Sequence, residues 1–160
     1  MTIRVATHQD LNELYGLWCE LMDEHQAFNP VFGYHRASEF QLKRVLRGRL
    51  AENNTRFFVV QGRYGLLGML IATYQIGNHG MQYFRRGYIA ETVVQQAHRR
   101  HGLGRGLFEA AKAWLTAQGA DHLELQVAVA NPAGIHFWES LGFAPTTYHL
   151  VQLLPKSPEE

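Results

Sequence analysis

A short basic loop with two spaced glycines has the residue types needed to hold a phosphate. Gly102 and Gly104 permit close approach of the backbone, and a stretch with helical periodicity begins at the same place. The first turn of a helix leaves backbone N–H groups unpaired and carries partial positive charge, so it favours an anion. Charged forks that match phosphate oxygens come from Arg99, Arg100 and Arg105. The segment predicts an anion site, with a plain helix start and solvated arginines as the alternative.

The same segment resembles the pyrophosphate-binding motif of the GNAT superfamily, the acyl-coenzyme A-dependent N-acyltransferases. That motif reads Arg or Gln, two residues, Gly, one residue, and Gly or Ala, and Arg99, Gly102 and Gly104 satisfy it. A Walker loop would need Gly-Lys-Ser or Gly-Lys-Thr, which this segment lacks. A dinucleotide-binding fold would place its glycines directly after a strand, whereas the polar stretch 95–101 intervenes here, so that interpretation ranks well behind.

A second segment, Asn131 to Phe143, is similar to the C-terminal motif of the same family. The usual form is Asn, two residues, Ala, three residues, Tyr, and then Gly-Phe a few residues later. Asn131 and the Gly142-Phe143 pair match, whereas Gly134 stands at the Ala place and Trp138 at the Tyr place. The resemblance implies a single-domain α/β (α+β) fold, in which helices flank a mixed, mostly antiparallel sheet. Two strands of that sheet would splay apart and admit pantetheine.

The resemblance also implies acetyl-CoA as the acyl-donor substrate. Residues of the two motifs and of the preceding strand end would bind it: Val93, Val94, Arg99, Arg100, Gly102, Leu103, Gly104, Arg105, Asn131 and Trp138. Asn131 would bond the pantetheine amide region, and it also suits a helix cap, two roles that are compatible. No metal is expected, because the histidines are scattered and His98 with His101 lacks a third matched ligand.

An amine acceptor must lose a proton before it attacks a thioester. With a lysine-like pKa of ~10.4, deprotonation at pH 7 costs about 4–5 kcal/mol, and a carboxylate within reach can accept the proton. Glu91 is the candidate base, because it is the only acidic residue on the strand that leads into the loop. Pleat alternation places it on the face of Val93, with Val94 pointing the other way. A structural role as a carboxylate at the edge of the core is an equally good interpretation.

The leaving thiolate needs less help than the amine. A thiol pKa of ~8.5 makes reprotonation at pH 7 favourable by about 2 kcal/mol. Trp138 replaces the family's usual general acid, and an indole N–H cannot supply a proton, so we expect Trp138 to pack or orient the thioester. Tyr148 is the second catalytic candidate, with His136 or solvent as other proton sources. A backbone N–H near Val93 or Val94, beside a strand bulge, would stabilise the oxyanion.

Hydrophobic periodicity predicts the elements that position these residues. Helices are expected over 11–25, 37–50, 103–118 and 132–141, and strands over 3–6, 56–61, 66–74, 88–94, 122–129 and 148–154. The strand after the third helix should run parallel to the strand before the loop. The aromatic loop 28–35 either packs on its scaffold or walls a pocket. An acidic face on the first helix is read as solvated, with an amine-facing wall as the alternative: Glu13, Glu20 and Glu24.

Composition places the chain among ordinary soluble proteins. It has 160 residues and a formal net charge of +1, and we expect one N-acetyltransferase domain over 1–154 with a polar tail over 155–160. The lone Cys19 and the lack of a signal-peptide core or membrane-length apolar run favour the cytoplasm.

The expected activity is acetyl transfer to a primary amine, on a small molecule or a peptide, by direct attack. No nucleic-acid or membrane partner is expected, and a homodimer is allowed. A catalytically weak acyl-CoA-binding or regulatory domain is the alternative, because Trp138 occupies the Tyr place. A nucleic-acid-binding module that uses the basic helix 37–50 is a more distant one.

Overall fold

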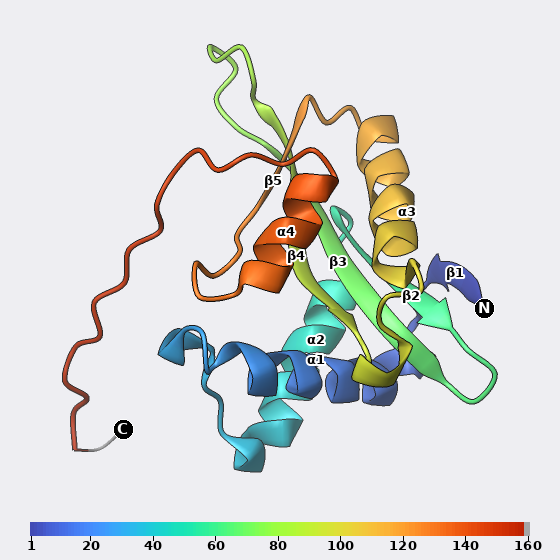
Figure 1. Cartoon of the computed structure of the whole chain (residues 1–160), viewed down its shortest axis with the longest axis vertical. Helices are drawn as coiled ribbons and strands as arrows, with labels where there is room; N and C mark the ends of the chain where they lie inside the picture. The colour runs from blue at the N-terminus through green and yellow to red at the C-terminus, as the bar shows by residue number, and fades with distance from the viewer. Residues whose placement is uncertain (159–160) are drawn as a thin grey trace.

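The computed structural model describes residues 1–158, which contain a five-stranded sheet with helices on both faces (Figure 1). The strands, adjacent in this order, are β1 (Thr2–Val5), β2 (Thr55–Gln61), β3 (Leu66–Ile76), β4 (Arg85–Val94) and β5 (His122–Leu125). The helices are α1 (Leu11–His25), α2 (Glu39–Leu50), α3 (Leu103–Ala117) and α4 (Pro132–Ser140). Short 3-10 turns occupy His8–Asp10, Pro30–Phe32, Arg36–Ser38 and Gln96–His98.

The direction of the strands confirms a mixed, mostly antiparallel sheet. β1 to β4 pair antiparallel, and β5 pairs parallel to β4 after the α3 crossover. Leu70 of β3 lies opposite Thr92, whereas Ala72 lies opposite Ile89, so β4 has one more residue than β3 between these pairs. This β-bulge contains Glu91. A bulge re-aims the side chains around it, so the strand is irregular at the candidate base.

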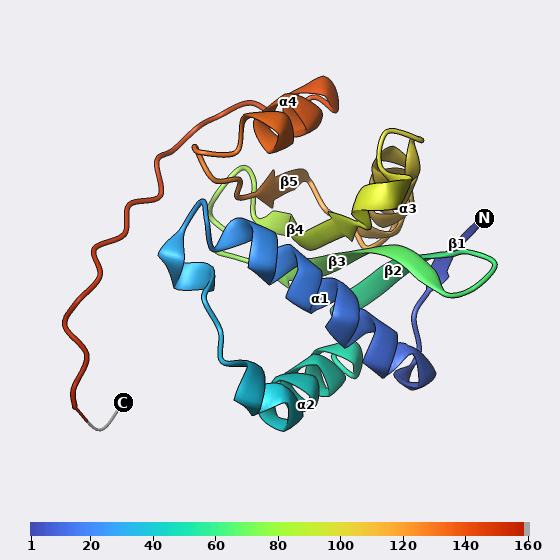
Figure 2. The same ribbon diagram turned by 60° about the horizontal axis from the view of Figure 1, so that its bottom comes forward.

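The sheet is the middle layer of three. Side chains of β2 alternate between its faces: Phe57 and Val59 pack with α1 and α2, while Phe58 and Val60 pack with α3 and α4. Figure 2 shows the two helix pairs on opposite sides of the sheet. Within residues 1–158, every helix is too short or too polar to span a bilayer.

Helix α2 buries a narrower stripe than its apolar residues suggest. Leu46 is buried and Leu42 and Leu50 pack partly against the core, whereas Phe40 and Val45 are exposed. The sequence alone makes Phe40, Leu42, Val45, Leu46 and Leu50 all available for burial, and this expectation was wrong for Phe40 and Val45. α2 contacts the rest of the protein along one side, through α1 and β2, so only residues at three- and four-residue spacing from Leu46 turn inward.

The expected strand over 148–154 is not formed. Residues 144–157 have no regular secondary structure and run away from the helices and sheet in both views (Figures 1 and 2). β5 also ends at Leu125, four residues before the expected end. A strand needs a hydrogen-bonded neighbour, and β5 has only β4, so β5 is the outer strand of this sheet.

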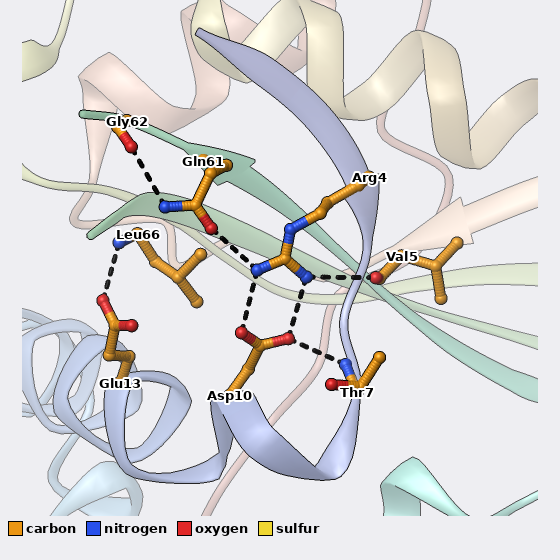
Figure 3. Close-up of polar contacts among 8 residues, drawn as sticks. All are labelled: Arg4, Val5, Thr7, Asp10, Glu13, Gln61, Gly62 and Leu66. Carbon is orange, nitrogen blue, oxygen red and sulfur yellow. Dashed lines mark hydrogen bonds and ion pairs between the residues drawn. The ribbon is translucent and has the colours of Figure 1, made fainter. Parts of the chain in front are cut away.

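A buried carboxylate joins the start of the chain to the sheet (Figure 3). Asp10 receives two hydrogen bonds from Arg4, at 2.8 and 2.9 Å, and one from the backbone N–H of Thr7 at 2.8 Å. Arg4 also donates to Gln61 at the end of β2. The hydrogen bonds from Arg4 hold the pKa of Asp10 below its ordinary value, although burial opposes them. This network fixes the entry into α1.

Replacing Asp10 with asparagine is expected to lower the free energy of unfolding by about 1–3 kcal/mol at pH 7, because charged hydrogen bonds are lost at a buried site. The native pKa of Asp10 is lowered, so its stabilisation is complete above about pH 4 and is lost as pH falls through the native pKa. The gap between wild type and variant should therefore shrink at pH 3. Urea unfolding at both pH values measures it, with the exposed Asp23→Asn as the control. An equal gap at both pH values contradicts the prediction.

Candidate active site

The basic loop adopts a conformation that exposes a row of backbone amides. Arg100 and Gly102 both have left-handed backbone angles, with φ of 65° and 79°. Gly106 donates to the carbonyl of Gly102 and so begins the helical ladder of α3. In the part of the chain that the structure describes, the backbone N–H groups of residues 102–105 have no hydrogen-bond partner. Unpaired amides at a helix N-terminus are the arrangement that favours an anion, and binding of a phosphate here stays a prediction.

The surroundings of these amides explain the second glycine. A side chain at Gly104 would place its Cβ 3.1 Å from the ring of Phe137 on α4. The glycine therefore lets the start of α3 approach α4 closely. Arg100 and Arg105 are exposed beside the amides and are free to meet a ligand. The structure thus brings together the glycines and two of the three arginines.

Arg99 has a different position from the one expected. Its Nε donates to the carbonyl of Val94 at 2.7 Å, and its Nη2 donates to Glu24 on α1 at 2.6 Å. This side chain ties the end of β4 to α1 and is not directed at the free amides. Sequence reasoning missed this partner, because Glu24 lies 75 residues earlier in the chain.

Three acidic residues of α1 have partners elsewhere in the protein. Glu13 accepts from the backbone N–H of Leu66 at 2.7 Å, and Glu20 accepts from that of Gln96 at 3.3 Å. Together with Glu24, they attach α1 to the β2–β3 hairpin and to the loop after β4. A purely solvated face was therefore a wrong expectation, while a role beside an amine stays a prediction.

The end of β4 presents unpaired backbone on one side. Gln95 donates to the carbonyl of Leu67, and successive residues of an antiparallel strand turn their backbone groups to opposite sides. Val93 therefore pairs with Met69, while the amide of Val94 faces away from β3. β5 pairs with β4 only as far as Ile89, so no strand covers Val94. The amide of Val94 is therefore open to a ligand, whereas that of Val93 is used in the ladder with β3; binding of a donor by either residue stays a prediction.

Glu91 is held by a guanidinium fork. Arg49 of α2 donates to both carboxylate oxygens, at 2.5 and 2.9 Å, and the two side chains are 26% and 19% exposed. Burial raises the pKa of Glu91, but the hydrogen bonds and charge of Arg49 outweigh burial and hold this pKa below its ordinary value. Glu91 is therefore ionised at neutral pH and is a weaker base than an unpaired carboxylate.

The sequence groups Arg49 with Lys43, Arg44 and Arg47 on a basic side of helix 37–50, and such sides are usually solvated. That expectation was wrong for Arg49, which turns inward to Glu91. Arg49 follows Leu42 by seven residues and Leu46 by three, which is the spacing of one helix face. That spacing was a signal that it turns inward. The positive charge of Arg49, taken alone, had favoured a solvent-exposed position.

Aromatic side chains from α1 and the following segment lie beside Glu91. The indole of Trp18 helps to lower the pKa of Glu91. Trp18 stacks on Tyr15, with ring centres 6.2 Å apart, and meets the edge of Tyr34 at 5.0 Å. Phe28, in contrast, packs against His25 within its own segment. Tyr34 and Phe28 of the aromatic loop thus pack on α1, which is one of its two interpretations, while a role as the wall of a pocket stays a prediction.

The second motif forms a helix cap and an aromatic core. The Asn131 side chain accepts from the backbone N–H of Gly134 at 3.1 Å and caps α4. Trp138 is buried, and its ring meets Phe108, Phe137 and Phe143 at centre distances between 4.8 and 6.0 Å. Trp138 thus packs within the core, and its expected role of packing or orienting a thioester stays a prediction.

The structure does not bring the second catalytic candidate to Glu91. Tyr148 is 87% exposed on the irregular C-terminal segment, and His136 is exposed on α4. An open hollow of about 610 Å³ lies at the opposite end of β4 from Glu91, where Asn54, Tyr74 and Arg86 line it. The free amides and two arginines therefore meet at the loop, next to Val94, while Glu91 lies three residues earlier on β4 and pairs with Arg49.

The fold is that of an α/β protein in which a helix start with free amides follows a bulged strand, in a sheet covered on both faces. A model of the Acetyltransferase (GNAT) family matches residues 17–143, which is most of the chain. The protein therefore belongs to the GNAT acetyltransferase family. This confirms the resemblance drawn from the two motifs.

Curated relatives match over shorter stretches. Human N-alpha-acetyltransferase 30 is 35% identical over 60 residues, which cover 38% of this chain and 17% of the human protein. Streptothricin acetyltransferase of Streptomyces lavendulae is 34% identical over 92 residues, or 57% of this chain and 46% of that protein. The chain thus matches less than half the length of either relative.

Solved structures share the whole fold. A tetramutant of the BH1408 protein from Bacillus halodurans superposes with a TM-score of 0.84 at 22% identity, over 96% of this chain and all of that one. Aminoglycoside N-acetyltransferase AAC(6')-Iy in complex with CoA superposes with a TM-score of 0.73 at 16% identity, over 96% of this chain and 93% of that one. At these identities the similarity establishes the fold.

Proposed function

We propose that the protein transfers an acetyl group from acetyl-CoA directly to a primary amine. The observation that supports this most is the juxtaposition of free amides at residues 102–105 with the bulged end of β4 that bears Glu91. A diphosphate bound at the amides leaves the rest of the donor to follow β4 toward Glu91. Membership of an acetyltransferase family agrees with this arrangement.

The donor would be held along a continuous path. Its diphosphate meets the amides of residues 102–105, including Leu103, and the side chains of Arg100 and Arg105. The pantetheine arm follows the uncovered side of β4 at Val94, where backbone groups lack a neighbouring strand. The side-chain oxygen of Asn131 caps α4, so its amide nitrogen remains available to donate a hydrogen bond to the pantetheine. A protein with the same fold, AAC(6')-Iy, has been solved in complex with CoA, which agrees with CoA as the ligand.

The transfer requires one bond to form and one to break. The amine nitrogen bonds to the thioester carbonyl carbon, the carbon–sulfur bond breaks, and the amine proton passes to Glu91 directly or through water. The Val94 amide donates to the developing oxyanion. The thiolate takes its proton from solvent, which is favourable at neutral pH. Since Arg49 lowers the basicity of Glu91, the site must also lower the pKa of the amine by desolvating it.

The side chains around Glu91 indicate the class of acceptor. Trp18, Tyr15 and Tyr34 supply apolar surface next to a carboxylate, which suits an amine on a small molecule or at a peptide end. Streptothricin, aminoglycoside and N-alpha-acetyltransferase relatives are named for such acceptors. We propose an acceptor from these amine classes.

A catalytically weak acyl-CoA-binding domain is the second candidate. Two observations favour it: Arg49 neutralises Glu91, and Tyr148 is remote from Glu91. Acetyl-CoA consumption, measured against peptide N-termini, amino sugars, polyamines and lysine, distinguishes the two. Turnover with any class supports the enzyme. A rise in melting temperature with coenzyme A, but no turnover, supports the binding domain. If the protein shows neither turnover nor a rise in melting temperature, both proposals are wrong.

The variant Arg49→Gln is expected to change the pH dependence of transfer. Without the guanidinium, burial dominates and the pKa of Glu91 rises. A base works only when ionised, so the acidic limb of the rate profile should move to higher pH, while the rate above that limb rises or holds. Initial rates between pH 5 and 9 measure the shift, and the exposed Arg47→Gln on the same helix is the control. An acidic limb that stays in place contradicts the coupling.

A further inference from the structure

The ion pair between Arg49 and Glu91 uses only part of the guanidinium. Arg49 donates through Nη1 and Nη2 to the two carboxylate oxygens of Glu91. A guanidinium has five N–H donors, so Nε–H and one hydrogen on each Nη are left. Within residues 1–158, Arg49 makes no other hydrogen bond. Nε and the neighbouring Nη of Arg49 are therefore a second fork of donors without a protein acceptor.

This second fork is held in place and is open to solvent. The guanidinium carbon of Arg49 lies over the ring of Phe57, 5.9 Å from its centre, so one face of the group is covered. The side chain of Arg49 is 26% exposed. A half-buried charge attracts an opposite charge more strongly than a surface charge does, because less water screens it. A fork in this position matches a carboxylate, which it can bind through two hydrogen bonds.

The neighbouring acidic side chain leaves the second fork unoccupied. Glu52 follows the end of α2, and its negative charge acts on Arg49. The carboxylate of Glu52 accepts instead from the hydroxyl of Thr55 at 2.9 Å. The second fork of Arg49 is thus available to an anionic group from outside the protein.

Two other cations on the same side of the sheet are already paired. Lys43 on α2 pairs with Glu39 at 3.4 Å, and Arg36, just before α2, pairs with Asp23 of α1 at 2.8 Å. α1 and α2 lie together on that side of the sheet (Figure 2). Arg49 is therefore the cation that is placed to meet an anionic group beside the candidate base.

The charge of the ion pair selects among amines. Arg49 and Glu91 together are neutral, so a simple ammonium ion adds an uncompensated positive charge next to a guanidinium. Uncompensated charge is costly at a half-buried site. A zwitterion adds no net charge, because its ammonium can face Glu91 while its carboxylate faces the second fork of Arg49. The pair therefore favours an acceptor that carries both signs.

We propose that the acceptor is a free α-amino acid, with its ammonium bound by Glu91 and its carboxylate bound by the second fork of Arg49. This inference rests on the proposed function, since it takes Glu91 as the base. One carbon separates the two groups of an α-amino acid, and Arg49 and Glu91 are in direct contact, so a single ligand reaches both. The side chain of the amino acid then meets the aromatic rings of Trp18 and Tyr34.

Acetyl transfer would also change how the ligand is held. The amine nitrogen bonds to the acetyl carbon and its proton passes to Glu91, so the product is an N-acetyl amino acid that keeps only its carboxylate. Once Glu91 has released the proton to solvent, two carboxylates share Arg49 with no ammonium between them. Their repulsion favours release of the product.

Three probes that differ in one group test the acceptor class: L-phenylalanine, L-phenylalaninamide and 2-phenylethylamine. The wild type is expected to prefer L-phenylalanine in kcat/KM. In Arg49→Gln this preference should fall by about 10- to 100-fold, mainly through KM, because hydrogen bonds to a charged group are lost. A changed pKa of Glu91 acts on all three probes alike, so it cancels when the preferences of wild type and variant are compared.

Two further variants separate the second fork from the fold. Arg47→Gln, at an exposed position of the same helix, should keep the full preference. Arg49→Lys keeps a positive charge beside Glu91 but lacks the second fork, so it should lose most of the preference at a melting temperature close to that of the wild type. This variant keeps the test decisive if Arg49→Gln does not fold. Equal use of the three probes by the wild type, or a preference that both Arg49 variants retain, overturns the inference.

Calorimetry separates this inference from the proposed activity. The probes are titrated into the protein saturated with coenzyme A, which carries no acetyl group, so binding is measured without transfer. Tighter binding of L-phenylalanine than of 2-phenylethylamine, lost in Arg49→Gln, supports the zwitterion site even if no acceptor is acetylated. Acetylation of all three probes, with a preference that Arg49→Gln leaves unchanged, overturns the acceptor class while the transferase stands.

Discussion

Replacing Glu91 with glutamine is expected to lower the acetyl-transfer rate by about 10²- to 10⁴-fold near neutral pH, because the amine loses its proton acceptor. The rate should recover as pH approaches the pKa of the amine itself, near ~10 for a lysine-like acceptor. Initial rates of wild type and variant between pH 7 and 10 measure this. A rate ratio that stays constant over that range would remove Glu91 as the base.

The same substitution breaks an ion pair, so its effect on stability must be separated from its effect on chemistry. Arg49 would lose a partner that now receives both of its hydrogen bonds. Half-buried charges left unpaired destabilise a protein. The double variant Arg49→Gln with Glu91→Gln removes the unpaired charge and is the matched control. If the double variant regains the wild-type melting temperature but not the transfer rate, Glu91 acts in the chemical step. If it also regains the rate, the role of Glu91 is structural.

Replacing Gly102 with valine is expected to abolish the rise in melting temperature caused by coenzyme A. Gly102 has a φ of 79°, which a β-branched residue adopts only with strain, and open space surrounds it. The backbone should therefore shift and dissolve the row of amides at residues 102–105. A ligand at 100 times its Kd stabilises by about 2.7 kcal/mol, so its absence is measurable.

The control for this substitution is Gly80→Val, because Gly80 also has open space around it but no left-handed backbone angle. That variant should keep the full coenzyme A effect. If Gly102→Val melts lower than wild type yet keeps the same ligand-induced rise, the amides are not the diphosphate site. Folding of both variants is checked by the melting transition without ligand.

Much of the fold follows from short-range pattern in the sequence. The helices and the first five strands lie where periodicity predicted them, since side chains three and four apart share a helix face and alternate residues share a strand face. The loop around Gly102 and the cap at Asn131 were also predictable, because both depend on residues within a few positions. Family membership followed from these same local motifs.

The sequence by itself thus determined the order of elements, the anion loop and the strand that bears Glu91. Only the tertiary structure decided the partners of its charges. Arg49 meets Glu91 across 42 residues and Arg99 meets Glu24 across 75, so each pair depends on which helix faces pack together. Residues 146–154 include strand-forming types but form no strand, because a strand also requires a neighbouring edge, and local sequence does not specify where that edge lies.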